Sequence, residues 1–437
     1  MGIPLDADLM NLESLGLIRR SPPSPDPAYH FRHALIQQEV YGSVTRRERQ
    51  VLHLAVGQIL ESLYRDRHEE VVHLLAYHFA VAGDGDRAVA YALRASDRAV
   101  ATYAYGEAIL HLQRALRLVD EGAPTEARWR LREALGNVHA LRHEGIHAID
   151  CYQRALTILE DMPGADRADT IRLHRKVVQV GAEIKWTVDR DAFQDVSRAA
   201  GASGDSLDRS LELIRDAPPH PETVRLLAVL SFAAWRMRQP PDWKMAAGHA
   251  RAAVRMASEL GSAVEHSVAL EALGNALFGL GQLRESLEAA EQRLAITSDP
   301  RFPDEREHLD ALRGVGVARA YLGEYELAIP PLLQAEQLAH RVQAADQLLN
   351  TLSILTLCWL RLDRWDEIRS RRDAWEALEQ QYSQERTGPL CWPMGLRAVV
   401  ELLCGETAAG AALRDRSVEI MTTTFGPSSG WLRNAHY

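Results

Sequence analysis

Apolar side chains recur along this chain at the three- and four-residue spacing of amphipathic helices. The spacing is clearest in three segments that align with one another: ALGNVHALRHEGIHAIDCYQRAL (134–156), ALGNALFGLGQLRESLEAAEQRL (272–294) and GVGVARAYLGEYELAIPPLLQAE (314–336). Each segment has an early glycine, a turn, and then a small residue within a second apolar stretch. Few stretches alternate with the period of two that is typical of strands. The pattern predicts an all-α chain built from repeated helical hairpins.

Anchor positions in the second helices, all but one of them small residues, set the period of the repeat. They fall at steps of 40, 98, 40, 42, 40 and 41 residues, at Ala108, Ala148, Ala246, Ser286, Ala328, Ile368 and Ala409. A fourth copy, residues 355–378, keeps this frame. The step of 98 must contain two units, one of them irregular. Residues 187–222 are predicted to be an irregular connector, with GASGD (201–205) and APPHP (217–221) as loops around a short helix.

Glycines predict where the helices cross and where they end. Two antiparallel helices pack closely only where small side chains let the backbones approach, so we expect Gly274 and Gly316 at helix crossings. Gly281 and Gly323 stand where the first helix of a hairpin must end. Glycine takes a left-handed C-cap without steric cost, so both are predicted to have a positive φ.

The repeat resembles the tetratricopeptide repeat in its Leu-Gly, turn Gly and paired small residues, although the family period is about 34 residues. The match extends over roughly residues 70–415 and implies a tetratricopeptide-like α-solenoid. In this family, first-helix side chains line a groove that binds a peptide or protein. The resemblance therefore gives four candidate groove residues: Asn137, Asn275, Arg313 and Asn350. We expect repeats at 66–186 and 223–420 and a C-terminal tail at 421–437.

Residues 1–65 have a different pattern. Leu9, Leu12 and Leu15 predict a short helix, and LIRR, SPPSPDPA and YHF predict a strand, a proline-rich tip and a returning strand. This order is typical of the end of a winged helix. Residues 33–41 should again be helical. Thr45 and Glu48 form a capping-box pattern for a following helix whose apolar face is Leu52, Val56, Ile59 and Leu63.

This N-terminal segment resembles the region that follows the ATPase core in bacterial signalling ATPases of the STAND class. That class includes proteins with nucleotide-cyclase domains and LuxR-type transcription regulators. The residues that match are Gly16, Leu17, Ile18, Phe31, Arg32, His33, Ala34, Leu35, Ile36, Tyr41, Leu52 and His53. The resemblance implies a winged-helix remnant and a partner ATPase or cyclase domain. The sequence has no GxxxxGK[ST] loop, so the phosphate-binding loop of such an ATPase is missing.

Composition and charge narrow the class of partner. The formal net charge is −10, and residues 1–67 contain eight arginines and eight acidic residues. A surface that reads DNA is expected to be basic, so nucleic acid is not a predicted partner. There is no run of eighteen apolar residues and no secretory signal pattern, so we predict no membrane segment and a cytoplasmic location. The four scattered cysteines fit reduced thiols.

One motif suggests catalysis: residues 143–147, HEGIH, match the HExxH pattern of zinc proteases. That chemistry needs both histidines on one face of an unbroken helix. In the aligned repeats the motif falls on a turn, so we predict no metal site, no cofactor and no catalytic residue. The favoured interpretation is a non-enzymatic scaffold, the repeat arm of an ATPase-type signalling regulator. Two alternatives stay open: the C-terminal part of an ATP-dependent transcriptional regulator or nucleotide cyclase, and a zinc hydrolase.

Overall fold

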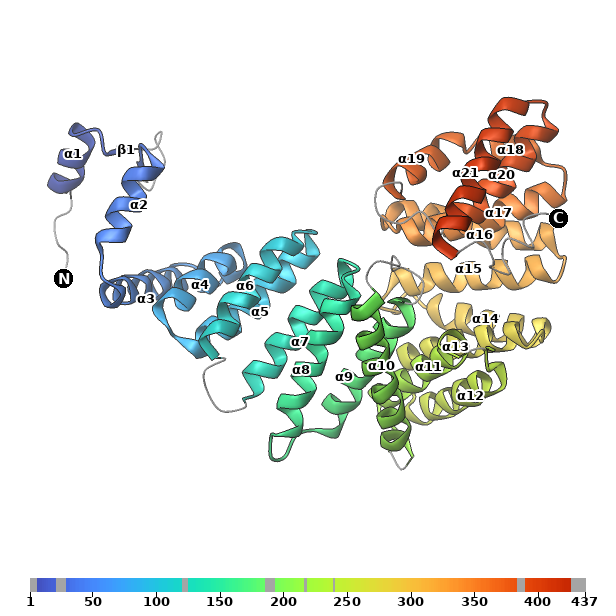
Figure 1. Cartoon of the computed structure of the whole chain (residues 1–437), viewed down its shortest axis with the longest axis horizontal. Helices are drawn as coiled ribbons and strands as arrows, with labels where there is room; N and C mark the ends of the chain where they lie inside the picture. Colours follow the sequence, from blue (N-terminus) through green and yellow to red (C-terminus); the bar gives the residue numbers. More distant parts are fainter. Residues whose placement is uncertain are drawn as a thin grey trace. The chain divides into compact units, whose positions relative to one another are not determined.

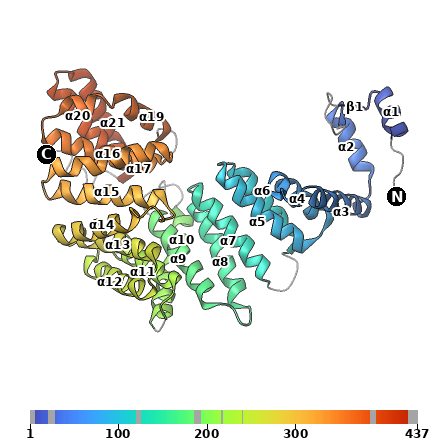
Figure 2. The same ribbon diagram turned by 180° about the vertical axis from the view of Figure 1, so that it is seen from behind.

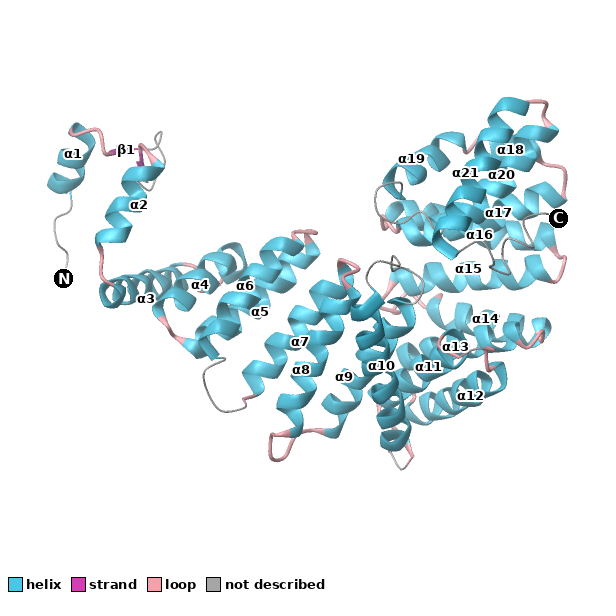
Figure 3. Cartoon of the chain, viewed as in Figure 1, coloured by secondary structure: helices cyan, strands magenta, loops and turns pink. Residues whose placement is uncertain are grey.

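Helices account for nearly all of the structure (Figure 1, Figure 3). In the part of the chain that the computed structural model describes, there are 21 α-helices and one two-stranded sheet. The prediction of an all-α fold is confirmed. The chain divides into two units, Met1–Val138 and His139–Tyr437, with the division inside one helix. The described residues are 6–20, 29–119, 125–184, 193–215, 218–238, 240–382 and 390–425.

The first unit begins with the predicted order of helix, strand, strand and helix. Its elements are α1 (Asp6–Ser14), β1 (Ile18–Arg20), β2 (Tyr29–Phe31), α2 (Ala34–Ser43) and α3 (Arg46–Leu63). The strands pair antiparallel, with Ile18 opposite Phe31. The proline-rich tip, 21–28, lies outside the described residues. The capping box at the start of α3 is confirmed: the Glu48 N–H donates to Thr45 Oγ1 (3.3 Å), and the Thr45 N–H donates to Glu48 Oε2 (3.0 Å).

The rest of this unit is formed by α4 (His68–Ala82), α5 (Gly85–Ala101), α6 (Tyr105–Val119) and the first part of α7 (Glu126–Leu141). Helix α4 packs against α3, α5 and α6. Its core contains Leu75 and Phe79, and the Phe79 ring stacks on Tyr91 at 5.5 Å. Alanines such as Ala88 and Ala95 on α5 leave space for these larger side chains.

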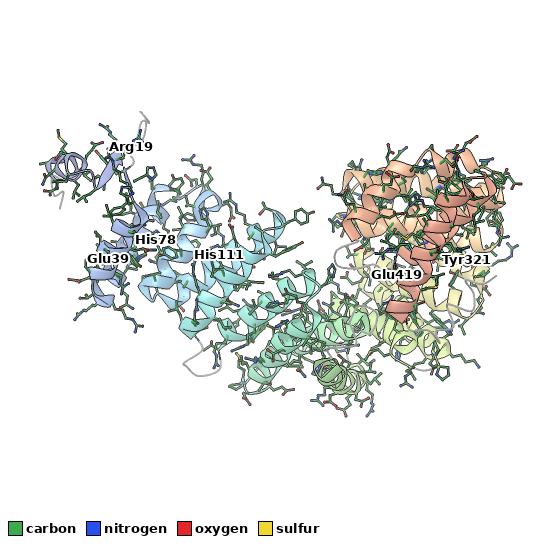
Figure 4. All side chains as sticks on the ribbon, turned by 45° about the horizontal axis from the view of Figure 1, so that its top comes forward. Arg19, Glu39, His78, His111, Tyr321 and Glu419 are labelled. Carbon is green, nitrogen blue, oxygen red and sulfur yellow. The ribbon has the colours of Figure 1, made fainter. Side chains whose placement is uncertain are left out.

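A chain of polar rings connects α2, α3 and α4. Tyr41 Oη lies 3.0 Å from His53 Nε2, and His53 Nδ1 lies 3.0 Å from Nδ1 of His78, which is labelled in Figure 4. Burial is the main reason why the pKa values of both histidines are lowered. The two rings are therefore neutral near pH 7 and can exchange a hydrogen bond.

The second unit stacks its helices in chain order, as the region from α11 to α17 shows from both sides (Figure 1, Figure 2). Helices α11, α13 and α15 each contact their sequence neighbours and also the second helix after them, which is α13, α15 and α17 in turn. This is the packing of a solenoid, in which each hairpin buries its apolar face against the next. The helices are α8 (Gly145–Glu160), α9 (Arg167–Ile184), α10 (Phe193–Ile214), α11 (Pro221–Arg236), α12 (Trp243–Leu260), α13 (Ala263–Gly279), α14 (Leu283–Thr297), α15 (Glu305–Tyr321), α16 (Tyr325–Arg341), α17 (Ala345–Arg361), α18 (Trp365–Arg369), α19 (Arg372–Tyr382), α20 (Cys391–Leu403) and α21 (Thr407–Phe425).

Several turns between helices contain a residue with positive φ. Gly281 (76°) and Gly323 (82°) are two of these residues, so both predicted left-handed caps are confirmed. The same feature recurs at intervals of 20 residues after Gly323, at residues that are not glycine. These non-glycine positions are Gln343 and Asp363, and two more occur earlier in the chain, at Tyr103 and His143.

Three local predictions were wrong. Residues 201–205 were expected to be a loop but lie within α10, because buried Ser203 and Ser206 place this small-residue segment on the packed face of the helix. Ala409 is exposed, and the small buried residue of the last hairpin is Gly410, whose Cβ would lie 2.6 Å from Leu402 Cγ. A Cβ on Gly274 would have normal contacts, the nearest at 3.7 Å, so this crossing is not tight.

Gly316 does lie at a tight crossing, as predicted. A Cβ at this position would lie 2.3 Å from Cγ of Leu332, which is fully buried. Real Cβ atoms do not approach this closely, so a side chain on residue 316 would force the buried Leu332 side chain, or the helix that carries it, to shift.

Candidate binding pocket

Two of the four predicted groove residues line the same pocket. Asn275 on α13 is exposed, Arg313 on α15 is half-buried, and both border a recess of about 180 Å³. Asn350, on α17, is exposed and does not line this recess. Asn137, on α7, belongs to the first unit. Of the three candidates in the second unit, Asn275 and Arg313 line one recess and Asn350 does not.

Three consecutive helices form the pocket, each through one helical face. The lining residues of α13 are spaced at i, i+3, i+4 and i+7, and those of α15 follow the same spacing. The pocket exists because small residues occupy its centre: a Cβ on Gly314 would come only within 3.8 Å of Ala290. The residues that line it are Leu270, Glu271, Gly274, Asn275, Phe278, Ser286, Ala290, Arg293, Asp310, Ala311, Arg313, Gly314, Val317 and Ala318.

A buried arginine of α14 holds the three helices together. Arg293 is only 4% exposed. Its Nη2 donates to Glu307 at 2.8 Å and to Glu271 at 3.2 Å, and its Nη1 donates to Asp310 at 2.8 Å. Its Nε donates to the hydroxyl of Ser267 at 3.2 Å. One guanidinium thus connects two carboxylates of α15 to a carboxylate and a hydroxyl of α13.

The carboxylates around Arg293 differ in how well they are neutralised. Asp310 also accepts a hydrogen bond from Nε of Arg313 at 2.9 Å. Although burial opposes it, the two arginines hold the pKa of Asp310 well below its usual range. Burial raises the pKa of Glu271, and neighbouring Asp310 and Glu307 raise it further, against the opposing effect of Arg293. Glu271 is therefore the carboxylate that is least well compensated.

The far end of the pocket is aromatic and apolar. Phe278, one of the lining residues, packs edge-to-face against Tyr321 with ring centroids 4.8 Å apart. Tyr321, labelled in Figure 4, is 48% exposed at the C-terminal end of α15. Residues 271 and 278 are seven positions apart on one helix, or about 10 Å along its axis. The pocket therefore has an acidic end and an aromatic end.

Sequence reasoning did not single out Glu271, Arg293 or Asp310, since charged residues on helices usually face water. One signal could have identified Arg293. It lies seven residues after Ser286, which was recognised as a packing residue, and residues seven apart share a helical face. An arginine on a packed face must find partners, and the aligned repeats place α13 and α15 on either side of it.

The HExxH segment lies on a turn, as predicted. Helix α7 ends at Leu141, α8 begins at Gly145, and His143 between them has a φ of 61°. Nδ1 of His139 lies 2.6 Å from Glu144 Oε2, and the His139 ring stacks on His147 at 5.4 Å. Within the described residues, no group of three or more His, Cys, Asp or Glu side chains could hold a metal ion.

The apolar face predicted for α3 lies at the surface of the first unit. Leu52, Val56, Ile59 and Leu63 are 40–70% exposed. Further exposed apolar side chains lie on the elements before it. They are Met10, Leu12, Leu15, Phe31, Leu35, Val40 and Tyr41. A contiguous exposed apolar surface is typical of a site that binds another protein, and the four residues of α3 share one face of that helix. We refer to these eleven residues of α1–α3 as the N-terminal apolar face.

No family model and no curated protein matches the chain. Solved structures do. A STAND protein with a tetratricopeptide repeat sensor from Pyrococcus horikoshii aligns with a TM-score of 0.52 at 12% identity, over 94% of this chain and 57% of that one. Aspartyl phosphate phosphatase F from Bacillus subtilis aligns with a TM-score of 0.52 at 13% identity, over 89% and 96% of the two chains.

These likenesses define the class of fold: the chain is a tetratricopeptide-like α-solenoid. It spans only 57% of the length of the STAND protein that it matches. Among the described residues, no helix is both long and apolar enough to cross a membrane.

Proposed function

We propose that this chain is a non-enzymatic regulatory scaffold that binds a peptide or protein segment in the groove formed by α13, α14 and α15. The observation that carries the proposal is the pocket between these helices. It combines a fixed charged floor, Arg293 and its carboxylates, with the side chain of Asn275 at the edge. An exposed asparagine amide can donate to and accept from the backbone of an extended peptide.

Peptide display can test this proposal. A random-sequence peptide library is panned on the full chain, and the selected peptides are then measured against variants. Gly274→Leu places a side chain in the pocket, and a Cβ has room at that position. Gly248→Leu is the matched control, because Gly248 is an exposed α12 residue with no atom within 4 Å of its Cβ.

We expect selected peptides to lose binding to Gly274→Leu and to keep it with Gly248→Leu. Asn275→Ala should reduce the binding of the same peptides. Because it only truncates an exposed side chain, it separates loss of the site from misfolding of Gly274→Leu. If no enriched peptide distinguishes wild type from Gly274→Leu and Asn275→Ala, the groove is not the binding site.

We further propose that the chain is the repeat arm of an ATPase-type signalling regulator, with the N-terminal apolar face against the ATPase or cyclase domain. Two observations support this: the exposure of Leu52, Ile59 and Leu63, and the likeness to the STAND protein, of which 43% is not matched (100% minus the matched 57%). In the alternative, the same arm is the C-terminal part of a longer ATP-dependent transcriptional regulator or nucleotide cyclase.

The two versions differ in where the ATPase is encoded. Sequencing of the transcript across the Met1 codon decides between them: an in-frame P-loop upstream supports the longer regulator, and an in-frame stop codon supports a separate arm. The role of the N-terminal apolar face is tested with the variants Ile59→Glu and Leu63→Glu, expressed in cells. Both should abolish co-purification of a P-loop protein that binds the wild-type chain. If the charged variants retain that protein, the N-terminal apolar face does not bind it.

A further inference from the structure

The charges around the pocket do not balance. When all three are ionised, Glu271, Glu307 and Asp310 contribute three negative charges against the two positive charges of Arg293 and Arg313, which leaves an excess of one. The pKa of Glu271 is raised to about 7, so this excess is complete only above neutral pH or when a cation binds beside Glu271. The excess is located at Glu271. Its contact with Arg293, at 3.2 Å, is longer than the 2.8 Å contacts that Glu307 and Asp310 make with the same guanidinium.

Glu271 is also the most open of the three carboxylates. Its side chain is 38% exposed, compared with 26% for Glu307 and 16% for Asp310. It lines the pocket, so its exposed part faces the space that a ligand would fill. Burial is the main reason that the pKa of Glu271 is raised, and Asp310 and Glu307 add to it; a cation beside Glu271 would oppose all three effects.

We propose that the pocket between α13, α14 and α15 binds the basic side chain of a peptide partner, a lysine or an arginine, with its charged group at Glu271 and its aliphatic stem toward Phe278. This inference rests on the proposed peptide-binding function and adds the chemistry of the ligand. The aromatic end suits the stem, because lysine and arginine bury their methylene groups along apolar surface while the charged head keeps its partner.

An anionic ligand does not fit the pocket. Both guanidiniums already donate to carboxylates: Arg293 to three of them, and Arg313 to Asp310. A phosphate or carboxylate would meet an excess of like charge, which opposes binding. A neutral side chain could fill the volume but would leave Glu271 uncompensated.

The test compares Glu271→Gln with wild type on the panned peptide library. Glutamine has the same shape as glutamate and can still accept from Arg293, so the variant should remain folded, which a melting curve verifies. Glu288→Gln is the matched control, because Glu288 is an exposed α14 carboxylate that does not line the pocket. Peptides selected on wild type are resynthesised with lysine, arginine, acetyl-lysine or norleucine at the enriched position.

We expect Lys or Arg to be enriched at one position, and Glu271→Gln to weaken those peptides about tenfold or more, the effect of losing a hydrogen bond to a charged group. Peptides with acetyl-lysine or norleucine should bind the wild type with lower affinity than the basic peptides. Their affinity should be the same for Glu271→Gln as for wild type. Glu288→Gln should leave all affinities unchanged.

Two outcomes would overturn the inference separately from the proposed function. If peptides bind and are lost with Gly274→Leu but show no basic preference, the groove binds peptides and the cationic subsite does not exist. If the basic peptides respond equally to Glu271→Gln and Glu288→Gln, the attraction comes from the overall negative charge of the chain and not from this pocket. If no peptide depends on the pocket at all, the proposed function fails together with the subsite.

Discussion

Replacing Arg293 with methionine tests whether the buried charge network holds α13, α14 and α15 together. Methionine keeps an unbranched stem but removes the donors that serve Glu271, Glu307 and Asp310. Removing one partner of a buried ion pair costs about 3–5 kcal/mol, because the remaining charge is left uncompensated. Glu271 and Glu307 retain some contact with water, so we expect a loss near the lower limit, about 3 kcal/mol.

Hydrogen exchange at pH 8 measures this loss helix by helix. Protection should fall in α13–α15 and stay unchanged in α4–α6, because a solenoid transmits stability between neighbours. Arg301→Met is the control: Arg301 is 90% exposed and pairs only locally, with Asp299 at 2.7 Å. An exposed pair of this kind contributes little to stability, so Arg301→Met should leave protection nearly unchanged. Equal effects of the two variants, or a uniform loss of protection along the chain, would refute the reasoning.

The cost of Arg293→Met should depend on pH in a defined direction. Without the arginine, the clustered carboxylates have folded-state pKa values above their unfolded values, so the folded variant binds more protons than the unfolded chain. Its stability therefore rises as the pH falls through those raised pKa values. In the wild type, Asp310 has a lowered pKa, and the stability it contributes is lost only when the pH falls below the ordinary Asp value of about 3.9. The difference in the free energy of unfolding between Arg293→Met and wild type should therefore become smaller from pH 8 to pH 5. A difference that becomes larger on acidification would contradict this account.

Four further predictions follow from single features of the structure. Glu271→Gln should stabilise the chain at pH 8 and lose that advantage near pH 4, since the raised pKa means that ionised Glu271 opposes folding; a pH series of melting curves checks this. Gly316→Ala should cost about 1–3 kcal/mol through its clash with Leu332, whereas Gly274→Ala should be neutral or gain up to about 1 kcal/mol of helix propensity, as denaturant titration will show. Gly281 should tolerate Asn better than Val in the same titration, because its φ of 76° is accessible to Asn. Chelation followed by metal analysis should leave the melting curve unchanged; loss of a bound zinc together with unfolding would show that the dismissal of His143 and His147 was wrong.

The helical hairpins were predictable because their determinants are local. Apolar spacing identifies a helix within a few turns, and a glycine such as Gly281 or Gly323 identifies its end. The turns at Tyr103 and His143 have the same left-handed geometry without a glycine; the repeat alignment predicted the turn at His143, but neither residue type indicates a positive φ. There the packing of the flanking helices imposes a conformation that the residue itself does not favour.

The site was predictable only in part. Position within the aligned repeat selected Asn275 and Arg313, which line the same recess; their role in binding stays a prediction. It could not select Glu271 or Asp310, because a carboxylate on a helix gives the same sequence signal whether it faces water or a buried arginine. The failed expectation at Gly274 has a similar origin: the alignment treats it as equivalent to Gly316, but Ser286 and Ala289 lie opposite Gly274 where the larger Leu332 lies opposite Gly316.

The charge network is difficult to explain by stability alone. The neighbouring helix α12 packs through fully buried alanines, Ala246, Ala250, Ala253 and Ala257, so this solenoid can join its helices without charge. Replacing a buried ion cluster by apolar residues of similar volume is often neutral or stabilising. What an apolar replacement could not provide is a fixed carboxylate excess at the end of a pocket. The network is accounted for by the cationic subsite proposed above: Arg293 orders three carboxylates, makes its shorter contacts to Glu307 and Asp310, and leaves Glu271 as the carboxylate proposed to receive a cation.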